Sequence, residues 1–232
     1  MVVAVVAGLA VTACSGGGAS GDSHLLSVIA DATVRDHTFQ FADTMAFPYS
    51  GANTFDEQGV VDDRAGAASF TMSQPGLPGE ESDILVKDTL YDRVESSEPG
   101  FSHGWCAMRG ALRHSGGPKL DPFDALDGLR SSGRSLHRIG TENVRGVATT
   151  HYHVSGNPPL DIWVDATDRV RRLRWTHGNA HQTDTEDLYD FGVSASITAP
   201  ASAPPCSFPH TSCTLGQSFS QLPSCSASDA TR

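Results

Sequence analysis

The alternation of apolar and polar positions predicts a helix followed by strands. Residues 22–33 place apolar side chains at helical spacing, and Asp22 or Ser23 can cap the first turn. From residue 38 the apolar period changes to two, as in a half-buried β-strand. The apolar face of this strand carries Phe39, Phe41, Met45 and Phe47. Asp43 falls on the same face and interrupts it.

The second half of the chain gives a further helix and then more strands. Residues 121–133 predict a helix, because Asp121 can cap it, Pro122 suits its first position and Gly133 can end it. Its buried stripe consists of Phe123, Leu126 and Leu129. Residues 135–191 return to short strands with glycines at the turns.

The segment 160–175 predicts a β-hairpin with a turn at residues 166–169. The predicted pairs are Asp165 with Val170, Ile162 with Leu173, and Trp163 with Arg172. One face then carries Leu160, Ile162, Val164, Leu173 and Trp175, and the other Asp161, Trp163, Asp165, Arg172 and Arg174. We expect the first face, which is apolar, to be buried and Arg172 on the other face to be exposed. A one-residue slip of the register would mix the two faces. Val170 and Arg171 each fall on the less suitable face in this register.

Charge excludes two classes of partner. Sixteen basic and 27 acidic residues give a net charge of −11, which argues against nucleic-acid binding and against charge-driven binding to anionic membranes. Residues 51–100 hold eleven acidic and three basic side chains. They lack the regular oxygen-ligand spacing of a calcium loop. We therefore interpret this segment as a solvated surface rather than a cation site.

The N-terminal residues have the pattern of an export and anchoring signal. An apolar stretch ends in small residues, and residues 11–14 (VTAC) match the lipobox of bacterial lipoproteins. The match implies cleavage before Cys14 and a lipid on its sulfur. The predicted divisions are a signal peptide at 1–13, a Ser/Gly tether at 14–21, a domain at 22–200 and a Cys-, Ser- and Pro-rich tail at 201–232.

The other cysteines agree with export. They are Cys106, Cys206, Cys213 and Cys225. An even number can form disulfides outside the cytoplasm, and four cysteines can pair in three ways.

Three segments resemble a known family of lipoproteins. They are residues 143–154 (NVRGVATTHYHV), 159–173 (PLDIWVDATDRVRRL) and 188–205 (LYDFGVSASITAPASAPP). They are similar to stretches of actinobacterial LppX/LprAFG-like lipoproteins, which have the LolA-like fold. The resemblance implies an α+β fold, in which a curved antiparallel half-barrel shelters acyl chains of exported lipids and helices cover its concave face. Related folds serve as envelope-stress sensors, and no catalytic residue comes with the resemblance.

Candidate chemistry is sparse. His151 and His153 lie on the same strand face and form a weak metal-binding pair, but no third ligand follows from the sequence, so we expect no metal. No nucleophile motif of the G-x-S-x-G type occurs. The carboxylate pairs at 62–63 and 80–81 fall in polar loops, which do not raise a pKa as general-acid catalysis requires. We therefore expect a protein without catalytic residues or cofactors.

Together these patterns predict a lipid-anchored monomer on the extracytoplasmic face of the cell membrane that binds lipid or another hydrophobic ligand. The alternative is an envelope interaction or sensor module with the same fold and no open lipid cavity. The residues expected to face a hydrophobic ligand are Phe39, Phe41, Met45, Phe47, Ile162, Val164, Leu173 and Trp175.

Overall fold

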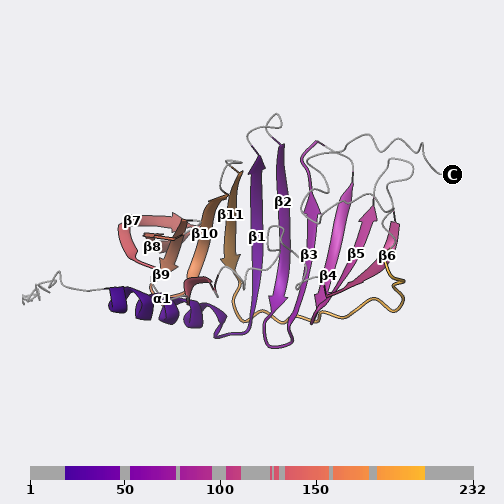
Figure 1. The fold of residues 1–232 in the computed structure, drawn as a ribbon, viewed down its shortest axis with the longest axis horizontal. Helices are drawn as coiled ribbons and strands as arrows, with labels where there is room; N and C mark the ends of the chain where they lie inside the picture. The colour runs from indigo at the N-terminus through magenta and orange to yellow at the C-terminus, as the bar shows by residue number, and fades with distance from the viewer. Residues whose placement is uncertain are drawn as a thin grey trace, which may run out of the picture.

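One open antiparallel sheet with a helix against one face makes up most of the computed structural model (Figure 1). The described residues are 19–47, 53–76, 79–95, 103–110, 126, 128–130, 134–156, 159–177 and 182–206. Their elements are α1 (Ala19–Val34), β1 (Thr38–Phe47), β2 (Asn53–Asp62), β3 (Ala67–Ser73), β4 (Glu80–Val86), β5 (Thr89–Glu95), β6 (His103–Arg109), β7 (Leu136–Val144), β8 (Val147–Val154), β9 (Leu160–Asp165), β10 (Val170–His177) and β11 (Gln182–Tyr189).

The strand order is β6-β5-β4-β3-β2-β1-β11-β10-β9-β8-β7. Strands β1 to β6 form a meander that extends to one side of β1, whereas β7 to β11 form a second meander that returns to pair with its other side. The two halves of the chain therefore meet at the β1–β11 pair. The predicted curved antiparallel sheet is confirmed. No helix among the described residues is both long and apolar enough to cross a membrane.

Helix α1 begins at Ala19, inside the segment predicted as a tether, and extends one residue beyond the predicted end. Its side chains Leu26, Ile29 and Ala30 are fully buried against the sheet. The hydroxyl of Thr33 accepts a hydrogen bond from the backbone N–H of Val170 at 2.9 Å, which ties the helix to β10.

The second predicted helix is described only in part. Leu126, Gly128 and Leu129 have helical backbone, and both leucines are fully buried in the core. The rest of residues 121–133, apart from Arg130, lies outside the described residues. Of the helices expected over the concave face, α1 is the one that the structure describes in full.

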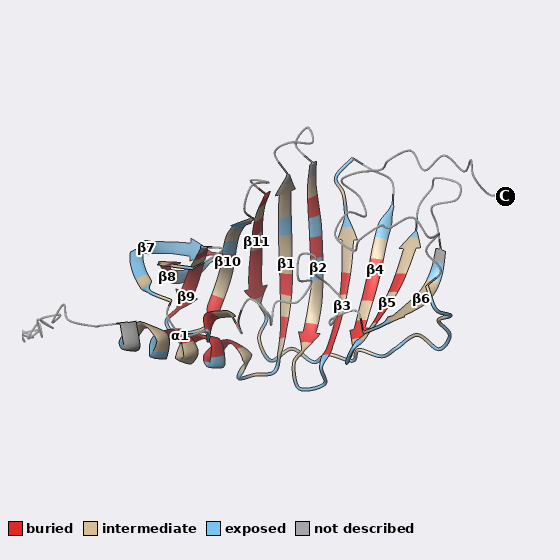
Figure 2. Cartoon of the chain, viewed as in Figure 1, coloured by how far each residue is buried: buried red, intermediate tan, exposed pale blue. Residues whose placement is uncertain are grey.

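The core lies on one face of the sheet, which we call the inner face, and buried positions alternate along the strands (Figure 2). Gly59 shows how closely this face is packed. It stands directly between Phe41 and Phe70 in the β1–β2–β3 register. A Cβ at Gly59 would lie 2.6 Å from the Cβ of Phe70 and 2.9 Å from the Phe41 ring, so only glycine allows these strands to pack with both rings in place.

The hairpin of β9 and β10 confirms the predicted pairs Ile162–Leu173 and Trp163–Arg172. The predicted pairing of Asp165 with Val170 is wrong, because Val170 pairs with Val164 and a β-bulge follows it. The extra residue is Arg171. The bulge returns Val170 to the buried face and lets the Arg171 guanidinium bind the Asp165 carboxylate at 2.6 Å.

Arg172 is less exposed than predicted. Its guanidinium donates two hydrogen bonds to the Asp187 carboxylate, at 2.6 and 3.0 Å, and its side chain is 32% exposed. The bond to Asp187 raises the pKa of Arg172. We expected Arg172 to be exposed because the sequence does not show that β11 pairs with β10 and places Asp187 opposite Arg172.

Truncating the two faces of β10 should have unequal effects. Leu173 is fully buried, so Leu173→Ala should lower the free energy of unfolding by about 2–4 kcal/mol. Arg172→Ala should lower it by about 1 kcal/mol, because the pair with Asp187 is only partly buried. Urea melts of the two variants measure the difference. A larger loss in Arg172→Ala would contradict the assignment of the buried face.

The chain after β11 runs along the ends of the central strands to the far edge of the sheet (Figure 1). There the N–H of Ala107 in β6 donates to the carbonyl of Pro204 at 2.8 Å, and the N–H of Cys206 donates to the carbonyl of Ala107 at 3.1 Å. A disulfide joins Cys106 to Cys206. The first residues of the predicted tail therefore pair with the exposed edge of β6, whereas residues 207–232 lie outside the described residues.

Candidate functional site: the inner face of the sheet

The structure gathers most of the predicted ligand-facing residues on the inner face. Those that are buried in the core are Phe39, Phe41, Ile162, Val164 and Leu173. Trp175 packs against this core and is partly buried. Met45 is also partly buried. The side chain of Phe47 and the whole of Cys14 lie outside the described residues.

Trp175 also lines a hollow at one end of β9 and β10. The hollow has a volume of about 250 Å³, and its lining includes His153, Leu160, Asp161 and Arg174. Its walls are both polar and apolar. Since pockets for drug-sized ligands usually measure about 300–1,000 Å³, this hollow is small for a lipid chain.

The inner face also carries acidic side chains that sequence reasoning missed. The strand register places Asp43 of β1 opposite Glu57 of β2 and opposite Glu186 of β11. On the neighbouring strands Asp83 of β4 lies opposite Asp92 of β5. Of these five, all but Asp43 are among the buried residues. The interpretation of residues 51–100 as a solvated surface is therefore wrong for Glu57, Asp83 and Asp92.

Burial and mutual repulsion make these carboxyl groups hard to ionise. Burial, followed by the charges of Glu81, Asp92 and Glu57, raises the pKa of Asp83 to about 9. Burial, followed by the charges of Asp43, Glu81 and Asp184, raises the pKa of Glu57 to about 8. Without a neutralising partner, both groups therefore keep their protons at neutral pH.

Two further carboxyl groups on this face have pKa values near neutrality. Burial, followed by the charge of Asp184, raises the pKa of Asp43 to about 7. Burial, followed by the charge of Asp92, raises the pKa of Glu81 to about 7. The expectation that residues 80–81 lie in a loop with ordinary pKa values is wrong for Glu81, because both residues belong to β4 and Glu81 points to the inner face.

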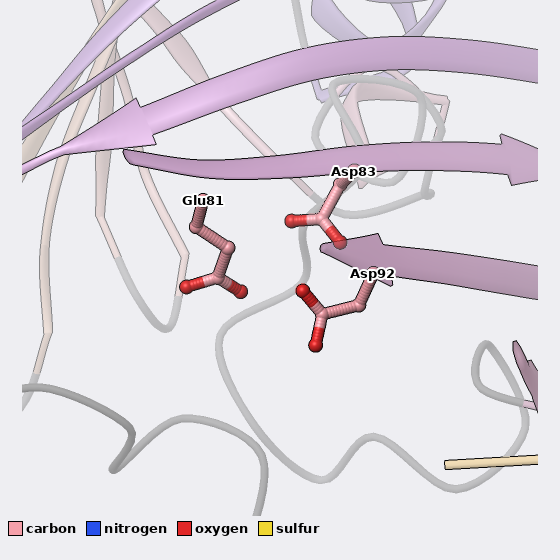
Figure 3. Close-up of side chains that lie close together, drawn as sticks. All are labelled: Glu81, Asp83 and Asp92. Atoms are coloured by element: carbon pink, nitrogen blue, oxygen red, sulfur yellow. The ribbon is translucent and has the colours of Figure 1, made fainter. Parts of the chain in front are cut away.

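Three of these carboxylates form a compact group (Figure 3). One oxygen from each of Glu81, Asp83 and Asp92 lies within 4.8 Å of the other two. Oδ1 of Asp83 is buried and has no hydrogen-bond partner. Two ionised carboxylates that face each other directly across paired strands are destabilising, so Asp83 ionises here only when a cation neutralises the group.

The histidine pair lies on the opposite, outer face. His151 is buried beneath Trp163, with the two rings stacked 4.1 Å apart, and its Nδ1 lies 3.0 Å from a Glu142 oxygen. Nδ1 of His153 lies 2.9 Å from a carboxylate oxygen of Asp161. Each imidazole is thus held by a carboxylate. In the part of the chain that the structure describes, the residues placed to share an ion are Glu81, Asp83 and Asp92 rather than this pair.

Comparison with known proteins gives remote similarities. No family model matches the sequence, and no curated protein matches it. Among solved structures, MucB in complex with MucA(peri) matches 81% of this chain at 14% identity and a TM-score of 0.41, and the chain spans 62% of that MucB chain.

Two further structures match over most of their own length. A LolA superfamily protein from Nitrosomonas europaea matches 73% of this chain and 91% of its own, at 10% identity and a TM-score of 0.33. An uncharacterized conserved protein from Thermus thermophilus matches 77% of this chain and 96% of its own, at 8% identity and a TM-score of 0.45. With TM-scores below 0.5, these similarities do not establish a shared family or function.

Proposed function

We propose that this chain is a non-enzymatic lipoprotein of the LolA-like class, anchored through Cys14 to the extracytoplasmic face of the cell membrane, which binds a hydrophobic ligand on its inner face. The lipobox at residues 11–14 supports the anchor. The disulfide between Cys106 and Cys206 supports export, because disulfides persist in oxidising compartments and are rare in the cytoplasm.

The anchor predicts a simple genetic result. Cys14→Ala removes the sulfur to which the lipid would be attached, so the protein should lose its membrane retention and its incorporation of a fatty-acid analogue. Fractionation and labelling of cells that express the full chain measure both. Cys213→Ala serves as the control and should keep both. Label that persists in Cys14→Ala would show that another residue carries the lipid.

The composition of the inner face is the observation that supports ligand binding. Within the buried inner face, β2 and β3 place the aromatic side chains of Phe55 and Phe70 beside buried carboxyl groups such as Glu57. A sheet that needed only a core would place apolar side chains there, because a buried carboxylate without a partner is unfavourable. Departures of this kind occur mainly at functional sites.

A neutral hydrophobic dye, N-phenyl-1-naphthylamine, tests this binding. We expect saturable fluorescence enhancement with the full chain. Met45→Gln, a half-buried position on the inner face, should weaken it several-fold. Thr44→Gln, on the outer face of the same strand, should not. Equal binding by both variants would place the dye elsewhere.

One observation favours the second function, an interaction or sensor module with a closed core. Four core side chains are each at most 1% exposed to solvent: Leu26, Ile29, Leu126 and Leu129. They belong to the packed core on the inner face, so a lipid that entered there would have to displace them. Failure of the wild-type chain to bind the dye would select this function over the first.

A further inference from the structure

We propose that Glu81, Asp83 and Asp92 form a calcium site on the inner face of the β4–β5 hairpin. The three carboxylates come from two paired strands, so the backbone fixes their spacing (Figure 3). Glu81 and Asp83 are two residues apart on β4 and share its inner face, and Asp92 faces Asp83 across the strand pair. The proposal is independent of whether the inner face binds a hydrophobic ligand.

The spacing of the three groups fits one calcium ion. Calcium binds carboxylate oxygens at about 2.3–2.6 Å, so ligands on opposite sides of the ion lie up to about 5 Å apart. One oxygen from each of Glu81, Asp83 and Asp92 lies within 4.8 Å of the other two. Magnesium binds at about 2.0–2.1 Å, which brings opposite ligands to about 4.2 Å. Oxygen-only donors are the ligands that such hard cations prefer.

The orphan oxygen of Asp83 is the second observation that points to a ligand. Asp83 is 2% exposed, and its Oδ1 is buried without a hydrogen-bond partner. Its carboxylate points toward Glu81 and Asp92 in Figure 3. A buried polar atom without a partner is unfavourable by about 1–3 kcal/mol. A cation between the three side chains would satisfy this oxygen.

Few basic residues of the surrounding strands are placed to neutralise the group when its carboxylates ionise. Strand β3 beside β4, and β2 beyond it, contain no basic residue, and β2 adds the carboxylate of Glu57. On β6, beside β5, Arg109 lies opposite Thr89, Cys106 lies opposite Asp92 and His103 lies opposite Val94. On the hairpin itself, Lys87 lies exposed in the turn. Arg93 faces Ser82 on the other side of the sheet and binds Glu95 at 3.0 Å. Since Lys87 and Arg93 of the hairpin are directed elsewhere, an ion from solution can supply the counter-charge when the carboxylates ionise.

Thermal melts of the purified full chain test the site. In a chelator the wild-type melting temperature should be lowest, and excess calcium chloride should raise it by about 5 °C. Calorimetric titration should give one site with a Kd on the order of 10⁻⁴–10⁻³ M, as in extracellular calcium modules. An unchanged melting temperature together with no calorimetric signal would overturn the proposal. An equal shift with sodium chloride at matched ionic strength would also overturn it, because the effect would then be general screening.

Isosteric variants separate binding from folding. Asp83→Asn and Asp92→Asn keep the side-chain shape and relieve repulsion, so both should fold in chelator at least as well as the wild type. Each should weaken calcium binding about tenfold or more, because affinity follows the number of charged ligands. Asp43→Asn alters a carboxyl group of the same face outside the group, and it should keep the calcium shift. Retained calcium binding in Asp83→Asn and Asp92→Asn would overturn the site.

Discussion

Removal of the Cys106–Cys206 disulfide should lower the free energy of unfolding by about 4 kcal/mol. The bond links residues that are 100 positions apart, and a loop of that size restricts the unfolded chain by about 4–5 kcal/mol. Cys106→Ser with Cys206→Ser removes the bond while keeping the side chains similar in size. Urea melts should show a lower midpoint, because the unfolded chain gains freedom and the folded sheet is otherwise unchanged.

Local opening at the sheet edge distinguishes this effect from a general loss of packing. Without the disulfide, two backbone hydrogen bonds still hold the chain around Pro204 to β6. We expect the amide of Ala107, which donates one of them, to exchange with solvent much faster in the double variant. Val61 is fully buried in the core, so the exchange rate of its amide should change only as far as the global stability changes. Unchanged urea midpoints would show that the hydrogen bonds alone suffice.

The alternation of side chains along the chain was enough to predict the sheet and one of its hairpins in detail. Ile162 and Leu173 were paired correctly because each apolar position on one strand needs an apolar partner across from it. The bulge at Arg171 was not predictable in the same way. An extra residue next to a turn leaves the pattern intact beyond it, and only the misplacement of Val170 and Arg171 signalled it.

The acidic half of the inner face was missed because carboxylates were assigned to the surface by residue type rather than by position. Asp83 stands two residues before Leu85, and Asp92 two residues after Leu90, so alternation places both acids on the buried face. That signal was present in the sequence. Their proximity to each other was not, since it depends on the register of β4 with β5.

The disulfide pairing could not be predicted for a related reason. Four cysteines allow three pairings, and no local pattern prefers one. Cys206 reaches Cys106 because the chain after β11 runs along the strand ends to the opposite edge of the sheet (Figure 1). This path depends on the whole sheet, because the number of strands between β11 and β6 sets the distance that the chain spans.

Raising the pH from 5 to 7 in the presence of a chelator should destabilise the protein, and Asp43 should account for part of the effect, beside Glu57, Glu81 and Asp83. Burial, followed by the charge of Asp184, raises the pKa of Asp43 from 3.8 to about 7 in the folded protein. The folded state therefore binds this proton more tightly than the unfolded state does. The resulting stabilisation is fully present below about pH 4, is lost as the pH rises toward 7, and is absent above it.

The expected size follows from the two pKa values. Between pH 5 and pH 7 the loss from this one group is about 2 kcal/mol, because the slope approaches 1.36 kcal/mol for each pH unit and flattens near the folded pKa. Asp43→Asn removes the ionisation, so the variant should be more stable than the wild type at pH 8 and should depend less on pH. The variant should also lower the pKa of Glu57, because the charge of Asp43 helps to raise it.

Urea melts at pH 5, 6, 7 and 8 measure the slope for each protein. Asp168→Asn is the matched control, since Asp168 lies exposed in the β9–β10 turn and its left-handed backbone, with φ of 63°, accommodates asparagine. This control should follow the wild-type curve. A wild-type stability that rises from pH 5 to pH 7, or an Asp43→Asn curve parallel to it, would show that the Asp43 carboxyl group ionises freely in the folded protein and that the inner face around it is hydrated.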